Sequence, residues 1–199
     1  TEKQPIQDVF SKINERINKE LKSDPSLPDN IEKLKSKVPY VGEVLLGHVR
    51  YGTFGGNSVE NVHPFLRRNN WMHRNLILAG NFNMTNSKEL FENLVEIGQH
   101  PKEYTDTVII MEEIGHFLDN SVRKIRKDLK KIELSKDEIT KKISKKLDVF
   151  KILRKASKKW DGGYVIGGLL GHGDSFVVRD PNGICLLYTS DAADDIPRV

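Results

Sequence analysis

Hydrophobic positions recur along this chain at two different spacings, and the spacing changes near residue 160. Before that point, apart from two short apolar runs, apolar residues recur every three or four positions, which is typical of amphipathic helices. We expect a helical hairpin over residues 1–37, with the breaker cluster SDPSLPDN at its turn, and further helices over 85–101, 106–134 and 137–160. After that point GGYVIGGLLG and DSFVVRD, joined by GHGD, predict a β-hairpin.

Two apolar runs in the first half of the chain predict buried strands. They are VLLGHVRY, residues 44–51, and RNLILAGNF, residues 74–82. Helices and strands therefore come in alternating blocks, which favours layers of helix packed on sheet. A chain of 199 residues is long enough for one good-sized core, and one domain is the default expectation.

Composition narrows the class of protein. Hydrophobic residues make up 37% of the chain and charged residues 30%, as in a soluble globular protein. The sequence has neither the run of about 18 apolar residues that a membrane helix needs nor a signal-peptide pattern, so we predict a cytoplasmic protein without membrane contact. The single cysteine, Cys185, excludes an internal disulfide framework.

The positive charge of the chain is concentrated in residues 121–159. This segment holds 16 Lys and Arg against five Asp and Glu, a net charge of +11; because the whole chain carries +4, the rest carries −7. Interleaved Ile and Leu at helical spacing favour a solvated helix face over a nucleic-acid site. The six histidines lack the paired spacing of a metal site, and we predict neither a metal nor a cofactor in this segment.

Polar residues next to the predicted strands are candidates for chemistry. Arg50 and Tyr51 end the first strand and Thr53 follows them, Asn81 is expected on a loop after the second strand beside Phe82, and Asp106 starts a helix. Each has an ordinary explanation as well. An arginine at a strand end is usually part of a structural ion pair, Asn81 suits a turn, and Asp106 suits a helix N-cap.

An ordered set of motifs gives these residues more weight: GHVRYGTFG, NVHPF, GNFNMTN, the Asp106–Thr107 pair, WDGGYV and RDPNGI. In this order they resemble class II glutamine amidotransferase domains, most closely the glutaminase domain of the amidophosphoribosyltransferases, which begin purine synthesis. The resemblance runs from about Leu45 to Ile184. It implies an α+β fold, the four-layer αββα sandwich of N-terminal-nucleophile hydrolases, incomplete here at the N-terminus.

The resemblance also implies a role for each matched residue. Arg50 would bind the α-carboxylate of glutamine, Tyr51 and Thr53 would shape that pocket, and Asp106 would bind the α-ammonium. The Asn81 side chain and the Phe82 backbone N–H would form the oxyanion hole. These residue types suit the chemistry, because a guanidinium binds a carboxylate through two parallel bonds and preorganised N–H donors stabilise a developing oxyanion.

The sequence departs from the family pattern in two places. Phe82 stands where the family has glycine, which raises the question whether the second oxyanion donor keeps its geometry. The N-terminal cysteine nucleophile of the family is missing, because the chain begins at Thr1 inside an amphipathic pattern, and TEKQPIQDVF lacks the apolar strand that a threonine nucleophile would begin. We therefore expect a piece that is truncated at both ends and has no glutaminase activity of its own.

The last residues do not follow the pattern of the rest. CLLYTSDAADD resembles a translated sequencing adapter, so we expect a partial glutaminase domain over residues 1–184 and a foreign tail over 185–199. The resemblance implies glutamine as the ligand, a missing C-terminal phosphoribosyltransferase domain and a homo-oligomeric full enzyme. From the pattern of the basic segment we expect no nucleic-acid partner. Alternatives are a hexosamine-forming or asparagine-forming amidotransferase, or a non-catalytic glutamine-binding protein.

Overall fold

The computed structural model describes residues 4–38, 40–48, 62–101, 103–130 and 133–187. It divides into two compact units, residues 1–55 and 56–199. Each unit is considered by itself below. The expected boundary at residue 184 stays a prediction.

The first unit is the predicted helical hairpin. Helix α1 (Pro5–Ser23) is followed by the 3-10 turn η1 (Leu27–Asp29) and helix α2 (Ile31–Lys37). Leu27 is fully buried at the turn, and the Asp24 carboxylate lies 2.7 Å from Lys33 Nζ. The strand expected over residues 44–51 is not found at Val44–His48, which is irregular, and its remaining residues lie outside the described part of the chain.

The second unit is built on an antiparallel sheet of four strands in the order β1-β2-β3-β4. Strand β2 (Leu76–Met84) and strand β3 (Gly162–Leu170) form its centre, with β1 (Phe65–Arg67) and β4 (Ser175–Arg179) beside them. The hairpin predicted after residue 160 is confirmed as β3–β4. Strand β1 was not predicted, because three residues that include an arginine give no periodic signal.

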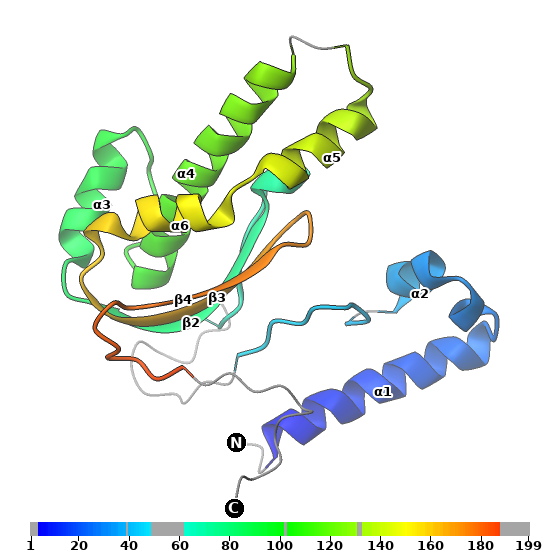
Figure 1. The fold of residues 1–199 in the computed structure, drawn as a ribbon. Helices are drawn as coiled ribbons and strands as arrows, with labels where there is room; N and C mark the ends of the chain where they lie inside the picture. The colour runs from blue at the N-terminus through cyan, green and yellow to red at the C-terminus, as the bar shows by residue number, and fades with distance from the viewer. Residues whose placement is uncertain (1–3, 39, 49–61, 102, 131–132, 188–199) are drawn as a thin grey trace, which may run out of the picture. The chain divides into compact units, whose positions relative to one another are not determined.

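Helices cover one face of this sheet (Figure 1). They are α3 (Ser87–Glu96), α4 (Asp106–Leu129), α5 (Lys136–Lys146) and α6 (Val149–Ala156), with the short 3-10 turns η3 (Met72–Arg74) and η4 (Ser157–Lys159). The core lies between the two layers, where Leu78 and Ile166 of the sheet and Ile110 and Leu118 of α4 are fully buried. The α+β prediction is confirmed, and the described residues supply one helix layer and one sheet layer of the expected four.

The helix expected over residues 137–160 is two helices rather than one. Leu147 ends α5 with an extended backbone, and the Asp148 side chain accepts a hydrogen bond from Lys151 N at 2.9 Å, capping α6. The apolar spacing continues through the break, so periodicity alone could not reveal it. The preceding helix also stops early, at Leu129 instead of residue 134.

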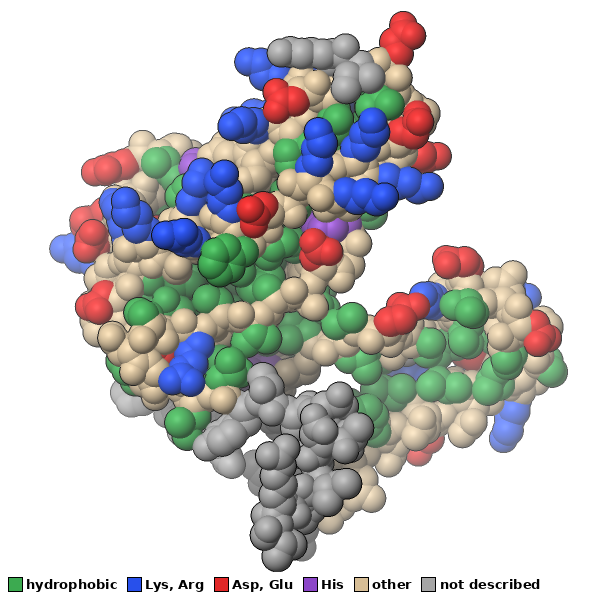
Figure 2. Space-filling view, viewed as in Figure 1, with side chains coloured by type: hydrophobic (Ala, Val, Ile, Leu, Met, Phe, Trp, Pro, Cys, Tyr) green, Lys and Arg blue, Asp and Glu red, His purple; other side chains and the backbone are tan. Residues whose placement is uncertain are grey.

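The basic segment is a solvated face, as its pattern predicts. Ile143 and Ile152 are buried in the core, whereas the lysines and arginines of α5 and α6 are exposed. Figure 2 shows these cations spread over the helices on the outside of the layer. Within the described ranges, no helix combines the length and the apolar character needed to cross a membrane.

Candidate functional site

The pairing of β2 with β3 decides which main-chain groups of β2 point to its other edge. Gly171 N donates to Asn75 O at 3.0 Å and Thr85 N donates to Asp161 O at 2.9 Å. In an antiparallel pair such bonds recur at every second residue, so odd-numbered residues of β2 bond to β3. The main-chain groups of even-numbered residues then point to the other edge, where β1 pairs with β2 only as far as Leu78.

Two side chains bind main-chain N–H groups on this edge. Gly80 N donates to His63 Nδ1 at 3.1 Å, and Met84 N donates to Asp106 Oδ2 at 3.0 Å. The N–H of Phe82 lies between these two bonds and points to the same edge. The predicted oxyanion donor is therefore flanked by His63 on one side and by Asp106 on the other.

Asn81 lies within β2, where it pairs with Val165, and not on a loop as expected. The ladder with β3 continues to Met84 because the sequence keeps alternating: Asn81 and Asn83 are exposed, while Phe82 is half-buried and Met84 buried. This period-two pattern was the available signal for a longer strand. The Asn81 side chain consequently stands on the face of the sheet that the helices do not cover.

Phe82 fits this strand without strain. Its backbone is extended, and among the described residues the non-glycine residue with a positive φ is Tyr40. Its side chain packs against the core, with its ring centroid 5.5 Å from that of His63. The backbone of Phe82 therefore does not need the positive φ that glycine tolerates, and the role of its N–H as an oxyanion donor stays a prediction.

Asp106 belongs to the first turn of α4 but does not cap it. Thr105 is the N-cap, and its hydroxyl accepts a hydrogen bond from Val108 N at 3.3 Å. This leaves the Asp106 carboxylate to Met84 N and to the Ser87 hydroxyl, which donates to Oδ1. The position also favours a negative charge, because the N-terminus of a helix carries a partial positive charge.

Of the six predicted site residues, Phe82 and Asp106 thus lie at the same edge of β2, whereas the Asn81 side chain stands on the face of the sheet opposite α4. The other three, Arg50, Tyr51 and Thr53, lie outside the described residues, and their roles stay predictions. Sequence reasoning assigned no role to His63 or Ser87. The one available hint was that His63 belongs to the NVHPF motif.

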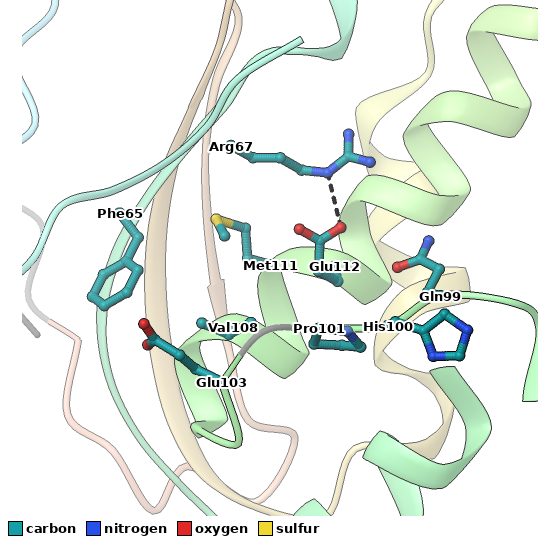
Figure 3. Close-up of a pocket in the computed structure, with 9 residues that line it drawn as sticks. All are labelled: Phe65, Arg67, Gln99, His100, Pro101, Glu103, Val108, Met111 and Glu112. Carbon is teal, nitrogen blue, oxygen red and sulfur yellow. Dashed lines mark hydrogen bonds and ion pairs between the residues drawn. The ribbon is translucent and has the colours of Figure 1, made fainter. Parts of the chain in front are cut away.

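A pocket of about 500 Å³ lies near this edge, between β1, the segment before α4 and α4 itself (Figure 3). Arg67 lines this pocket, and its guanidinium is already engaged in ion pairs. Its Nε bonds to Glu112 at 3.1 Å, and its terminal nitrogens bond to Asp119 at 2.9 and 3.3 Å. Four of its five N–H groups have partners, because Nη1 also donates to Arg74 O at 3.4 Å. Arg67 is therefore a poor replacement for Arg50 as a carboxylate clamp.

Comparison with known proteins decides the family. The model of the class II glutamine amidotransferases matches residues 10–154. The chain belongs to this family. Across the described residues, His, Cys, Asp and Glu side chains form no group of three or more that could hold a metal ion.

Two curated relatives of this glutamine amidotransferase chain are both named amidophosphoribosyltransferase. The amidophosphoribosyltransferase of Pasteurella multocida is 30% identical over 145 residues, which is 72% of this chain and 24% of the relative. That of Methanothermobacter thermautotrophicus is 29% identical over 157 residues, 79% of this chain and 26% of the relative. The chain thus spans about a quarter of the length of these curated relatives.

A solved structure described as the allosteric regulatory enzyme of purine biosynthesis is also similar to this chain. It aligns with a TM-score of 0.47 at 24% identity, covering 68% of this chain and 23% of that one.

Proposed function

We propose that this chain is the glutamine-binding and glutamine-hydrolysing part of an amidophosphoribosyltransferase. In the whole enzyme, ammonia released from glutamine would pass to a separate domain that transfers it to phosphoribosyl pyrophosphate. Membership of the family and the shared name of the relatives support this reading. A cytoplasmic location and a homo-oligomeric whole enzyme are parts of the same proposal.

The observation that carries the proposal is the pair of groups at the end of β2. Residues two apart in a strand are about 7 Å apart, so this is the spacing between the Phe82 and Met84 N–H groups. Asp106 is bound at Met84 N. An extended glutamine spans a similar distance between its ammonium nitrogen and its side-chain amide oxygen, so one molecule could reach both Phe82 and Asp106.

Each end of the ligand would then meet suitable chemistry. A carboxylate has about four lone-pair sites, and Asp106 uses one oxygen for Met84 N and the other for the Ser87 hydroxyl, which leaves capacity for an ammonium. The Phe82 N–H and the Asn81 amide would donate to the oxyanion that forms when the amide carbonyl is attacked. Arg50, with Tyr51 and Thr53 beside it, would hold the α-carboxylate.

Calorimetric titration of the chain tests the binding half of this proposal. We expect L-glutamine to bind and Asp106→Asn to weaken binding at least tenfold, because an amide does not supply the charge that an ammonium needs. Asp137→Asn is the matched control, since Asp137 is an exposed residue in the first turn of α5. Equal glutamine affinity in all three proteins would exclude Asp106 as the ammonium site, and no heat with wild-type protein would contradict the proposed function.

The acceptor is tested with the complete gene. Its product should release pyrophosphate from phosphoribosyl pyrophosphate only when glutamine or ammonia is supplied. Glutamine-dependent use of a sugar phosphate or of aspartate instead would assign the chain to a hexosamine-forming or asparagine-forming enzyme.

A further inference from the structure

His63 connects the two elements that carry the candidate site. Its Nδ1 accepts the hydrogen bond from Gly80 N, 3.1 Å away, on the residue before Asn81. Its Nε2 lies 3.2 Å from the Thr107 hydroxyl, on the residue after Asp106. One imidazole ring thus spans from β2 to the first turn of α4.

The two bonds together define the state of the ring. A main-chain N–H can only donate, so Nδ1 must be the unprotonated acceptor. The proton of a neutral imidazole is then on Nε2, which donates to the Thr107 hydroxyl. The ring is also held by its neighbours, edge-on to Phe65 at 5.2 Å between centroids and tilted against Phe82 at 5.5 Å.

We propose that His63 is a positioning residue for glutamine binding. By bonding next to Asn81 on one side and next to Asp106 on the other, it sets the spacing between the oxyanion donors of β2 and the ammonium-binding carboxylate of α4. The proposal rests on the proposed function, since it assumes that both elements contact the same glutamine molecule.

His73 shows what a histidine with only a structural role looks like in the same unit. It is buried, and its Nε2 lies 3.0 Å from Thr140 O and 3.1 Å from the Ser144 hydroxyl. Both partners belong to α5, which contributes nothing to the candidate site. His73 is therefore the matched control for His63.

Three substitutions separate the two bonds. His63→Asn keeps an acceptor at the position of Nδ1, His63→Gln keeps a donor at the position of Nε2, and His63→Phe keeps only the ring. We expect His63→Phe to weaken L-glutamine binding about tenfold or more. The glutamine affinities of His63→Asn and His63→Gln should lie between those of His63→Phe and the wild-type chain. His73→Phe should leave glutamine affinity unchanged even where it lowers the melting temperature.

A double-substitution cycle distinguishes positioning from general stability. If His63 acts through Asp106, the losses of glutamine affinity from His63→Phe and Asp106→Asn are not additive, and the double variant loses little more than Asp106→Asn alone. A merely structural histidine would give additive losses.

The outcomes separate the two proposals. If wild-type chain binds glutamine and His63→Phe binds it equally well, the positioning role of His63 is overturned while the proposed function stands. If additive losses are found in the cycle, the same proposal fails. If wild-type chain binds no glutamine, both proposals are overturned together.

Discussion

Helix α4 is joined to the β1–β2 pair by polar contacts at two places, and the two are built differently. At the first place Arg67 of β1 pairs with Glu112 and Asp119 of α4, so that one cation meets two carboxylates. Burial alone would lower the pKa of Arg67, but these carboxylates outweigh it and raise the pKa. Arg74 adds a second cation, with its Nε 3.6 Å from Asp119 Oδ1, so two cations meet two carboxylates. Arg67 has little capacity left for a ligand.

At the second place side chains bind main-chain N–H groups and neutral hydroxyls instead of forming ion pairs. His63 accepts from Gly80 N and Asp106 accepts from Met84 N. Asp106 is held by a neutral N–H and a neutral hydroxyl instead of by a cation of the described residues, and such a carboxylate suits a cationic ligand group. Paired charges near Arg67 thus stabilise the fold, whereas the edge of β2 carries the groups that we propose bind glutamine.

Removing the ion pairs of Arg67 with α4 should give the largest loss of stability. Arg67→Met leaves the mostly buried Glu112 without its partner and leaves Asp119 with Arg74 alone, 3.6 Å away, and breaking a buried pair in this way typically costs about 3–5 kcal/mol. Urea unfolding measures the loss, with the exposed Arg123→Met on α4 as control. Glutamine affinity of the folded protein should stay the same, and a variant that remains as stable as the control would contradict the structural role.

Gly115→Ala should have the next largest effect, also on stability. A Cβ at this position would collide with the Arg67 side chain, which lies across the helix. Overpacking of this kind costs about 1–3 kcal/mol, more than the roughly 1 kcal/mol that alanine gains over glycine in a helix. Thermal unfolding checks the sign: a stabilised variant would mean that Arg67 moves aside easily.

A smaller effect is expected from changing the contacts of Asp106 at the edge of β2, and it should appear in the affinity for glutamine. Ser87→Ala removes the hydroxyl that donates to Asp106 Oδ1. Losing a hydrogen bond to a carboxylate is worth about 1.5–3 kcal/mol at most, and because Ser87 orients Asp106 without touching the ligand, we expect only a several-fold rise in the Kd for L-glutamine. Ser121→Ala on α4 is the control, and unchanged affinity in Ser87→Ala would mean that Asp106 is oriented by Met84 N alone.

The smallest effect is expected at Glu113 of α4, which belongs neither to the Arg67 ion pairs nor to the edge of β2, and it concerns how stability depends on pH. Glu113 is buried, accepts a hydrogen bond from Trp160 Nε1, and has a raised pKa because burial disfavours its charged form. Its stabilising neutral form is present at low pH and is lost as the pH rises through the pKa of the folded protein. Glu113→Gln should therefore remove part of the fall in melting temperature between acidic and neutral pH, and an unchanged pH profile would contradict the assignment.

The elements with strong periodicity were predictable from the sequence, and the junctions between elements were not. Helix α3 and the β3–β4 hairpin follow from apolar spacing and from the turn residues around them. The break at Leu147–Asp148 was missed because the helical spacing continues across it. Strand β1 was missed because it has only three residues and shows no local periodicity. Its pairing with β2 and the ion pairs of Arg67 involve residues that are distant in the sequence.

The sequence could predict which residue types belong to the candidate site but not how their side chains are arranged. Asn81, Phe82 and Asp106 were proposed from motif resemblance, and the strand position of Asn81 was missed although the alternation of polar and apolar residues continues to Met84. His63 was missed because its partners are 17 and 44 residues away in the sequence. The roles of Arg50, Tyr51 and Thr53 stay predictions.

The most direct test of the account is an NMR titration of the ¹⁵N-labelled chain with L-glutamine, read at the backbone amides. We expect the largest shifts on Asn81, Phe82 and the first turn of α4 from Asp106, with little change around Arg67 and Glu112. Shifts centred on the Arg67 pocket or on the basic helices α5 and α6 would contradict it, because glutamine would then bind where the charges are already paired or fully solvated.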